Sequence, residues 1–265
     1  YNLVNYQKVS CITMNSSENL VSFGKGLNVT VFGATGGIGK ALTHNLSENK
    51  NTERVFAISR SPNKQNNHKV TSLQADIENE NDIKRVADYL RSNVGELHMV
   101  LVATGVLHVR DKIKPEKSWR ALDANSLETI FRINAFGPAL IAKHFLPLLA
   151  RKRKSIFAAL SARVGSIEDN HLGGWYAYRG SKAALNMLIR TLSIELNRLN
   201  PHAICVGLHP GTVNTSLSKP YQGSVPKKDL FSAQHSAGYL LNVVNNLQKE
   251  HSGRIFAWDG KPIPF

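Results

Sequence analysis

The most constraining feature of this chain is a regular alternation of short apolar runs with longer stretches of helical periodicity, which starts at Leu27. The apolar runs predict strands at residues 27–32, 54–59, 70–74, 98–103, 155–160, 203–208 and 254–258. Helical periodicity predicts helices at residues 38–46, 83–90, 127–149, 178–199 and 232–247. Strands that alternate with helices form parallel sheets, and continuous apolar strands belong to sheets covered on both faces. We therefore predict an α/β fold in which one doubly wound parallel sheet of about seven strands is flanked by helices.

Length and composition set the class of protein. With 265 residues, of which 42% are hydrophobic and 20% are charged, the chain has the size and composition of one globular domain. No apolar run reaches the ~18 residues that a membrane-spanning helix needs. Cys11 and Cys205 form no disulfide or metal framework, and the histidines show no ligand spacing. We therefore expect a cytoplasmic protein without a membrane partner and without a metal.

Residues 1–26 differ from the rest of the chain. They are rich in asparagine and serine and contain no basic segment followed by an apolar one, so we expect no signal peptide. Met14 is a candidate natural start, which would make residues 1–13 an addition. We expect residues 1–26 to form an N-terminal extension that is poorly ordered or draped over the surface, and residues 27–265 to form the domain.

The net charge of +14 would suit nucleic acid, an anionic surface or an anionic cofactor. The densest basic run, RKRK at residues 151–154, follows a predicted helix and precedes a predicted strand. Cations are favourable at a helix C-terminus, and no recognition motif or aromatic interleaving accompanies the run. We therefore favour a solvated helix end over a nucleic-acid patch and expect no nucleic-acid partner.

A glycine-rich turn joins the first predicted strand to the first predicted helix in the string VFGATGGIGKAL. Gly33, Gly37 and Gly39 form the pattern G-x-x-x-G-x-G, and Ile38 begins the helix. Glycines permit positive φ and let a pyrophosphate approach the backbone, while the helix N-terminus attracts its charge. The turn predicts a Rossmann-like dinucleotide site, and a plain tight turn is the alternative.

The tip of the second predicted strand carries Ser59 and Arg60 and no acidic residue. In dinucleotide-binding folds an acidic residue here binds the ribose hydroxyls of NAD, whereas an arginine accommodates the 2′-phosphate of NADP. Lys64 adds a second cation nearby. We therefore predict NADP (NADPH) as the cofactor, and the alternative for Arg60 is a solvent-facing loop residue.

Tyr178 and Lys182 are four residues apart at the start of a predicted helix, in the string WYAYRGSKAALNML. Residues at this spacing share a helix face, so a phenol and an ammonium group can address one small site. A cation near a phenol lowers its pKa from about 10, which would let the tyrosine exchange a proton near neutral pH. A surface pair with no chemical role is the alternative for these two residues taken alone.

Together these strings resemble the short-chain dehydrogenase/reductase family over roughly residues 27–260. The strings SARVGS and GGWYAYRGSKAALN, with the ending FAWDGK, most resemble its C-factor-like and sniffer-like carbonyl reductase branch. Further positions match the family pattern one by one: Asp76 with Ile77 after the third predicted strand, Gly105 after the fourth, Asn134 in the long helix, and Pro210, Gly211 and Thr215 after the sixth.

The resemblance implies that NADPH lies across the carboxyl ends of the strands, held by the residues above together with Tyr178 and Lys182. Hydride would pass to a carbonyl carbon while Tyr178 protonates the developing alkoxide. Lys182 would hold the nicotinamide ribose and lower the pKa of Tyr178. Asn134 would distort its helix and hold a water that links Lys182 to solvent, and a polar residue on the helix surface is the alternative for Asn134 taken alone.

The family's catalytic serine falls in the string LSARVGS. Counted from Gly165, the serine of many relatives would fall on Ala162, and Ser161 is one residue early. We expect Ser161 to supply the hydroxyl that bonds the carbonyl oxygen, with Ser166 as the second candidate and a strand-end serine bonded to its own backbone as the alternative.

The chain is therefore expected to be an NADPH-dependent oxidoreductase that reduces a ketone or aldehyde to an alcohol, or catalyses the reverse. The alternative is an NADP-binding signalling or sensor protein of C-factor type without relevant turnover. The long connection at residues 212–229 is a candidate lid. His108, Leu172, Trp175 and Tyr221 are candidates for the wall of the substrate pocket, and a place in the core or at a subunit interface is the alternative for Trp175. The partners would be a small carbonyl or alcohol and a second copy of the chain, in a homodimer or homotetramer.

Overall fold

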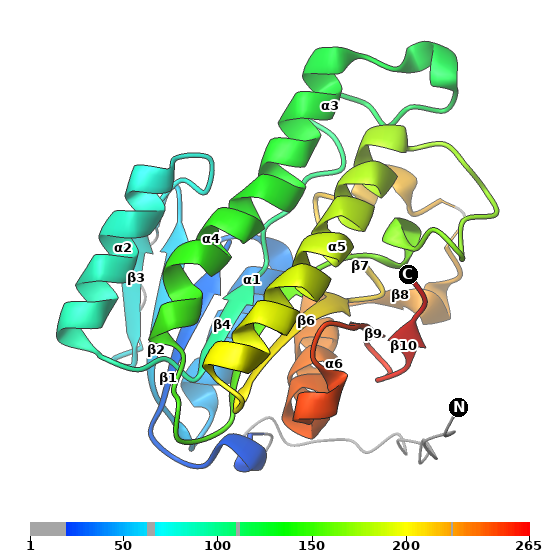
Figure 1. The fold of residues 1–265 in the computed structure, drawn as a ribbon. Coiled ribbons are helices and arrows are strands. Elements are labelled where there is room, and N and C mark those ends of the chain that lie inside the picture. The colour runs from blue at the N-terminus through cyan, green and yellow to red at the C-terminus, as the bar shows by residue number, and fades with distance from the viewer. Residues whose placement is uncertain (1–19, 63–66, 110–111, 224) are drawn as a thin grey trace.

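The computed structural model describes residues 20–62, 67–109, 112–223 and 225–265. Within these ranges a central sheet has eight strands in the order β10-β9-β6-β5-β4-β1-β2-β3 (Figure 1). The strands are β1 Leu27–Phe32, β2 Thr52–Ser59, β3 Val70–Gln74, β4 Met99–Val102, β5 Ser155–Leu160, β6 Ala203–His209, β9 Ile255–Ala257 and β10 Pro262–Ile263. All neighbouring pairs are parallel except β9 with β10. The predicted doubly wound α/β fold is confirmed, with an antiparallel edge strand that was not predicted.

Helices cover both faces of this sheet, as the continuous apolar strands predict. One face carries α2 Glu80–Asn93, α4 Gly137–Phe145 and α5 Tyr176–Leu199, and the other carries α1 Gly37–Glu48 and α6 Ala233–Asn246 (Figure 1). Two clusters of buried side chains fill the spaces on the two sides of the sheet. None of the helices in the described ranges is long and apolar enough to cross a membrane.

The remaining elements are short. A separate two-stranded sheet pairs β7 Thr212–Val213 with β8 Leu230–Phe231. Single 3₁₀ turns lie at Val21–Phe23, Trp119–Ala121, Leu146–Leu148, Arg163–Gly165, Lys219–Tyr221, Lys227–Asp229 and Lys249–His251. The β7–β8 pair closes the segment predicted as a lid into a loop whose two ends are hydrogen-bonded to each other.

The long helix predicted at 127–149 is divided into three parts. α3 Ala124–Phe131 runs into a π-helical turn, Arg132–Phe136, which continues as α4. Pro138 has no N–H group to donate to the carbonyl of Asn134, four residues earlier, so the regular helical hydrogen-bond pattern is interrupted at this point. The helix is therefore distorted at the turn that contains Asn134, where the family resemblance implies a distortion. Such π-helical turns are frequent at functional sites.

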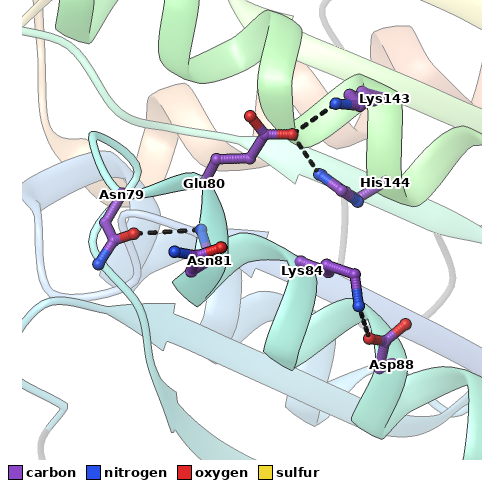
Figure 2. Close-up of polar contacts among 7 residues, drawn as sticks. All are labelled: Asn79, Glu80, Asn81, Lys84, Asp88, Lys143 and His144. Carbon is purple, nitrogen blue, oxygen red and sulfur yellow. Dashed lines mark hydrogen bonds and ion pairs between the residues drawn. The ribbon is translucent and has the colours of Figure 1, made fainter.

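An exposed polar link joins α2 to α4. The carboxylate of Glu80, at the start of α2, accepts hydrogen bonds from Lys143 Nζ at 2.6 Å and His144 Nε2 at 2.9 Å, both in the last turn of α4 (Figure 2). These bonds, above all the one from Lys143, lower the pKa of Glu80. Negative charge at a helix start and positive charge at a helix end both interact favourably with the helix dipole, so the residues of this link suit the two helix ends they occupy.

The basic run at residues 151–154 is only partly solvated. Arg151 and Lys152 are exposed, but Arg153 donates to the carbonyl oxygen of Lys25 at 2.7 Å and also contacts His98. The prediction of a solvated helix end is therefore wrong for the second half of the run. Arg153 holds the chain segment that enters β1.

Lys154 has the same kind of structural role. Its ammonium donates to Ser22 Oγ at 2.9 Å and to the carbonyls of Val244 and Asn245, near the end of α6, at 3.1 and 2.7 Å. It also lies 4.4 Å from the ring centre of Phe23, and burial lowers its pKa to about 8. This residue clamps the 3₁₀ turn Val21–Phe23 onto the domain.

The N-terminal boundary follows from these contacts. Leu20 is fully buried and Phe23 is 2% exposed, so both belong to the core. The expectation of an extension over residues 1–26 thus gives way to packed structure from residue 20 onward, because residues 20 and 23 place apolar side chains against the sheet. The predictions for residues 1–19, including Met14 as a start, lie outside the described residues.

We predict that Lys154→Ala lowers the free energy of unfolding by about 1.5–3 kcal/mol, the range for hydrogen bonds to a charged group. The loss arises because the carbonyls at the end of α6 lose their donor. Urea denaturation measures it. Lys152→Ala, two residues earlier and exposed, is the control and should change stability by less than about 0.5 kcal/mol. Equal effects of the two substitutions would contradict the clamp.

Candidate active site

The carboxyl ends of the parallel strands meet at one edge of the sheet, which is where doubly wound folds bind their ligands. Gly33 directly follows β1 with φ of 77°, and its N–H donates to the Ile58 carbonyl of β2 at 2.9 Å. A Cβ atom on Gly39 would overlap the Gly33 carbonyl oxygen, and one on Gly37 would lie 2.6 Å from Thr215 Cγ2. The glycine turn is therefore too tight for side chains, and Thr215 lies directly against it.

The start of α1 suits an anionic group. α1 begins at Gly37, and its N-cap residue Gly36 offers no side chain to the N–H groups of the first turn. Gly36 and Gly37 are exposed, so a ligand can reach these N–H groups. Ile38 is half-buried and packs against the core below. The turn thus has the backbone chemistry that a pyrophosphate needs.

Ser59 and Arg60 lie at the end of β2. The Ser59 hydroxyl is buried and has no hydrogen-bond partner among the described residues, whereas the Arg60 side chain is exposed. Buried hydroxyls are almost always bonded, so this unpartnered oxygen fits a ligand contact. Lys64, which the sequence adds to this pair, lies outside the described residues. The residues present therefore fit a nicotinamide dinucleotide.

Asp76 and Ile77 follow β3, as predicted. One Asp76 carboxylate oxygen accepts from the Glu78 N–H at 3.0 Å, which shapes a tight turn and leaves the side chain half-buried. Ile77 packs on the start of α4, because a Cβ atom on Gly137 would lie 2.9 Å from Ile77 Cδ1. The loop after β3 is thereby held against the helix that follows Asn134.

Pro210, Gly211 and Thr215 follow β6, also as predicted. The Pro210 carbonyl accepts from Ser236 Oγ of α6 at 2.8 Å. Gly211 has φ of 76°, and a Cβ atom there would lie 2.6 Å from the Phe231 ring of β8. These contacts direct the chain after β6 toward the glycine turn.

Tyr178 and Lys182 share one face of α5. Lys182 Nζ donates to the Leu160 carbonyl at the end of β5 at 2.7 Å and lies 5.8 Å from the centre of the Tyr178 ring. Burial lowers the pKa of Lys182 to about 8 and raises the pKa of Tyr178 to about 12. The shift of Tyr178 is opposite to the one expected from the sequence, because burial of the phenol is its cause and the ammonium bonds a carbonyl instead. At neutral pH Tyr178 is therefore a protonated acid.

Asn134 is fully buried in the π-helical turn. Its side-chain oxygen accepts from the Val106 N–H and its amide donates to the Val106 carbonyl, both at 2.8 Å. The amide also donates to Ser181 Oγ of α5 at 3.1 Å. A Cβ atom on Gly105 would lie 3.4 Å from both Asn134 Oδ1 and Lys182 Nζ. Gly105, Asn134 and Lys182 thus converge as the family pattern implies.

Ser161 has a partner that the sequence did not indicate. Its hydroxyl donates to Asn186 Oδ1 at 2.6 Å in a buried position, and Asn186 in turn donates to the Gly165 carbonyl at 3.3 Å. A hydroxyl carries one proton, so Ser161 cannot donate to a substrate while it holds this bond. Ser166 is no substitute, because its hydroxyl donates to the Phe265 carbonyl at 3.4 Å. The geometry therefore does not support the prediction that either serine serves the carbonyl oxygen.

An aromatic cluster stands beside Tyr178. The Trp175 ring packs edge-on against Tyr178, with ring centres 6.3 Å apart, and against Tyr221, with centres 5.3 Å apart. Tyr221, from the predicted lid, also packs against His108 at 5.8 Å. Three of the four predicted pocket residues thus meet around Tyr178. Leu172 does not, since its side chain is 91% exposed and makes no part of this cluster.

Sequence reasoning missed Glu116, which no motif marks. Its side chain is 4% exposed, and one carboxylate oxygen accepts from the Ala177 N–H at 3.2 Å. Its backbone carbonyl accepts from the Trp175 N–H. Trp175 is the N-cap residue of α5 and provides no capping bond itself. Glu116 therefore caps α5 from a distant loop and holds the helical turn that contains Tyr178.

Two further residues of α5 act on the same region. Arg179 donates to the carbonyls of Gly173 and Gly174 at 3.2 and 3.0 Å and to that of Val164 at 3.3 Å. Asn186, the partner of Ser161, lies four residues after Lys182, so the same helical spacing that identified Tyr178 and Lys182 could have identified it. Both residues attach the loops around β5 to the helix.

We predict that Ser161→Ala lowers the free energy of unfolding by about 1–3 kcal/mol, because Asn186 Oδ1 is left buried without a donor. Ser92→Ala, on the exposed side of α2, is the control and should be nearly neutral. Turnover should fall by less than the roughly 10²-fold that loss of an oxyanion donor costs. A larger loss of turnover, with stability unchanged, would restore Ser161 as the catalytic hydroxyl.

Comparison with known proteins agrees with this fold. Residues 27–224 match the family model described as short chain dehydrogenase. The chain is 28% identical over 255 residues to an uncharacterized oxidoreductase of Schizosaccharomyces pombe, covering 89% of this chain and 96% of that protein. It is 38% identical over 151 residues to the C-signal of Myxococcus xanthus, covering 56% of this chain and 85% of that protein.

Solved structures of similar fold include an NADPH-bound carbonyl reductase from chicken fatty liver, with a TM-score of 0.80 and 24% identity over 94% of this chain and 98% of that one. The carbonyl reductase Sniffer of D. melanogaster has a TM-score of 0.77 and 24% identity over 91% of this chain and 100% of that one. The family match spans the glycine turn, Asn134, Tyr178, Lys182 and Thr215. The resemblance seen in the sequence is confirmed: the chain belongs to the short-chain dehydrogenase/reductase family of oxidoreductases, whose Rossmann-type fold binds a nicotinamide cofactor.

Proposed function

We propose that this protein uses NADPH to reduce the carbonyl group of a ketone or aldehyde to an alcohol, or catalyses the reverse reaction. The observation that carries the proposal is the convergence of Tyr178, Lys182 and Asn134 at the sheet edge where the glycine turn lies. A protein that only bound a nucleotide would need the glycine turn but not this arrangement. Small carbonyl or alcohol compounds are accordingly the proposed substrates.

The cofactor would be held by the glycine turn, by Ser59 and Arg60 at its adenosine end, and by Lys182 at its nicotinamide ribose. Asp76, Ile77 and Gly105 would flank the adenine and ribose, and Pro210, Gly211 and Thr215 the nicotinamide. When bound, NADPH supplies the hydride for reduction of a carbonyl carbon.

Tyr178 would donate its proton to the carbonyl oxygen as negative charge develops there. Burial raises the pKa of Tyr178 to about 12, which keeps the phenol protonated and ready to donate at neutral pH. Lys182 would return a proton to Tyr178, and a pKa lowered by burial to about 8 makes its ammonium a better donor than an exposed lysine. Asn134 would hold the water that connects Lys182 with solvent.

A second candidate is an NADP-binding protein without relevant turnover. The observation that favours it is the match to C-signal, the highest identity among the relatives named above. In that case the protein would bind NADPH but would not consume it with any carbonyl compound. Assays of NADPH consumption with a panel of ketones and aldehydes separate the two candidates.

We also propose a cytoplasmic homodimer or homotetramer. Apolar side chains remain exposed on α5 and on the π-helical turn, where Met187 is 66%, Phe136 50% and Ile194 45% exposed. Exposed apolar side chains on adjacent elements are typical of subunit contacts. Sedimentation of the purified protein tests the proposal.

For Tyr178→Phe we predict a loss of at least ~100-fold in turnover, because the general acid is removed. Binding of NADPH should stay within a few-fold of wild type, as measured by fluorescence titration. The exposed Tyr176→Phe, two residues earlier, is the matched control. Comparable turnover in both variants would reject Tyr178 as the proton donor.

The pH dependence of the reaction rates of the wild-type protein follows from the Tyr178 phenol. Reduction needs the protonated phenol, so its rate should stay level across neutral pH, where a phenol with a pKa of about 12 is protonated. Alcohol oxidation needs the phenolate, so its rate should rise with pH by up to about tenfold per unit below that pKa. Steady-state rates in both directions measure this, and an oxidation rate that falls with rising pH would contradict the assignment.

Cofactor choice gives a further prediction. NADPH should bind at least ~10-fold tighter than NADH, a difference of about 1.4 kcal/mol, because Arg60 and Ser59 can bond the 2′-phosphate. The double variant Ser59→Ala/Arg60→Asp should abolish or invert the preference. Arg54→Asp, at an exposed position of the same strand, is the control. Equal affinity of wild type for both cofactors at one salt concentration would reject the NADP assignment and leave the reductase proposal standing.

A further inference from the structure

An open groove of about 460 Å³ lies beside the aromatic cluster. It is lined by Lys114, Pro115, Lys117, Trp175, Pro220 and Tyr221. Its volume lies in the range of small-molecule sites. The groove is formed by two segments that are far apart in sequence, the loop after β4 and the predicted lid, together with Trp175, the N-cap residue of α5.

The groove adjoins the proposed catalytic tyrosine. Trp175 and Tyr221 line it, and the same two rings form the cluster at Tyr178 and His108. A planar molecule in the groove would contact the Trp175 and Tyr221 side chains, and Trp175 in turn packs against Tyr178. The groove and the catalytic site therefore share the Trp175 ring.

The charge of the groove is positive. The exposed side chains of Lys114 and Lys117 stand on its wall, and the described residues that line it include no acidic side chain. Neither lysine has an ion-pair partner within the described ranges. Lys219, next to Pro220 in the predicted lid, is also exposed. Unpaired ammonium groups beside aromatic rings are suited to an anionic, planar ligand.

Glu116 holds the segment that carries Lys114 and Lys117 in place next to the helical turn of Tyr178. It lies between the two lysines in sequence, but its side chain is buried and bonded to the start of α5 through the Ala177 N–H. Its backbone carbonyl holds the Trp175 N–H as well. The lysine-bearing segment is thus attached directly to the helical turn that carries the catalytic phenol.

We propose that the substrate of this protein is a carbonyl compound that carries a carboxylate or similar anionic group, which Lys114 and Lys117 bind while the planar body packs against Trp175 and Tyr221. The proposal rests on the reductase function proposed above and specifies the substrate class of the same site. Hydride and proton transfer remain as described there, and the anionic group takes no part in the reaction.

The test compares 4-carboxybenzaldehyde with its neutral methyl ester, methyl 4-formylbenzoate, as substrates with saturating NADPH. In the double variant Lys114→Gln/Lys117→Gln, the KM for the acid should be about tenfold higher than in wild type, the effect expected for loss of two exposed ion pairs. The KM for the ester should stay within about twofold of the wild-type value. Added salt should raise the KM of the wild-type protein for the acid, and it should leave the KM of the double variant for the acid unchanged.

The control double variant is Lys152→Gln/Lys249→Gln, which removes the same charge at exposed positions away from the groove. It should leave the acid-to-ester ratio of kcat/KM as in wild type, because only long-range attraction is lost. An equal loss in both double variants, or an equal loss for acid and ester, would overturn the proposal in favour of general attraction between a basic protein and anions.

A binding measurement separates this proposal from the reductase proposal. Calorimetry with NADPH present compares the binding of 4-carboxybenzyl alcohol with that of its methyl ester, because an alcohol and the reduced cofactor cannot react with each other. Tighter binding of the acid, lost in Lys114→Gln/Lys117→Gln, supports the anionic site even if no carbonyl compound is reduced. Reduction of the ester with no preference for the acid in either measurement refutes the anionic site and leaves the reductase function intact.

Discussion

The buried ammonium of Lys182 is the contact on which the rest of the site depends. A buried charge needs hydrogen-bond partners, and this one bonds the Leu160 carbonyl at the end of β5 at 2.7 Å. The turn after β5 lies directly on α5, since a Cβ atom on Gly165 would come within 2.7 Å of Lys182 Cβ. Strand end, turn and helix therefore form one unit, and the place of Tyr178 at the sheet edge follows from it.

The start of α5 is held in an unusual conformation by distant groups. Trp175 is the one residue other than glycine with positive φ in the described ranges, at 52°. Such a conformation costs about 1–3 kcal/mol and persists only when its surroundings enforce it. The Glu116 carbonyl accepts a hydrogen bond from the Trp175 N–H, and Arg179 donates to the carbonyls of the two residues that precede Trp175. As a result the Trp175 ring faces both Tyr178 and the lysine-lined groove.

The strands show which parts of the fold a local sequence pattern can predict. Predicted strands 70–74 and 155–160 coincide with β3 and β5, and β5 is a buried apolar run with clear ends. β10, Pro262–Ile263, was not predicted, since two residues at a sheet edge give no periodic signal. The prediction that the basic run at 151–154 is solvated is wrong for Lys154, which bonds carbonyls about 90 residues away in sequence. A local sequence pattern cannot predict a hydrogen-bond partner that is so distant along the chain.

The sequence by itself determined the alternation of strands and helices, the glycine turn and the pairing of Tyr178 with Lys182. Each depends on spacing within a few residues, which backbone geometry converts directly into structure. Tertiary structure alone decided that Ser161 bonds Asn186, 25 residues away, and that Glu116 caps α5 across 61 residues. It also decided that burial sets the high pKa of Tyr178. These properties depend on which groups surround a side chain after folding, and neighbours in space are not neighbours in sequence.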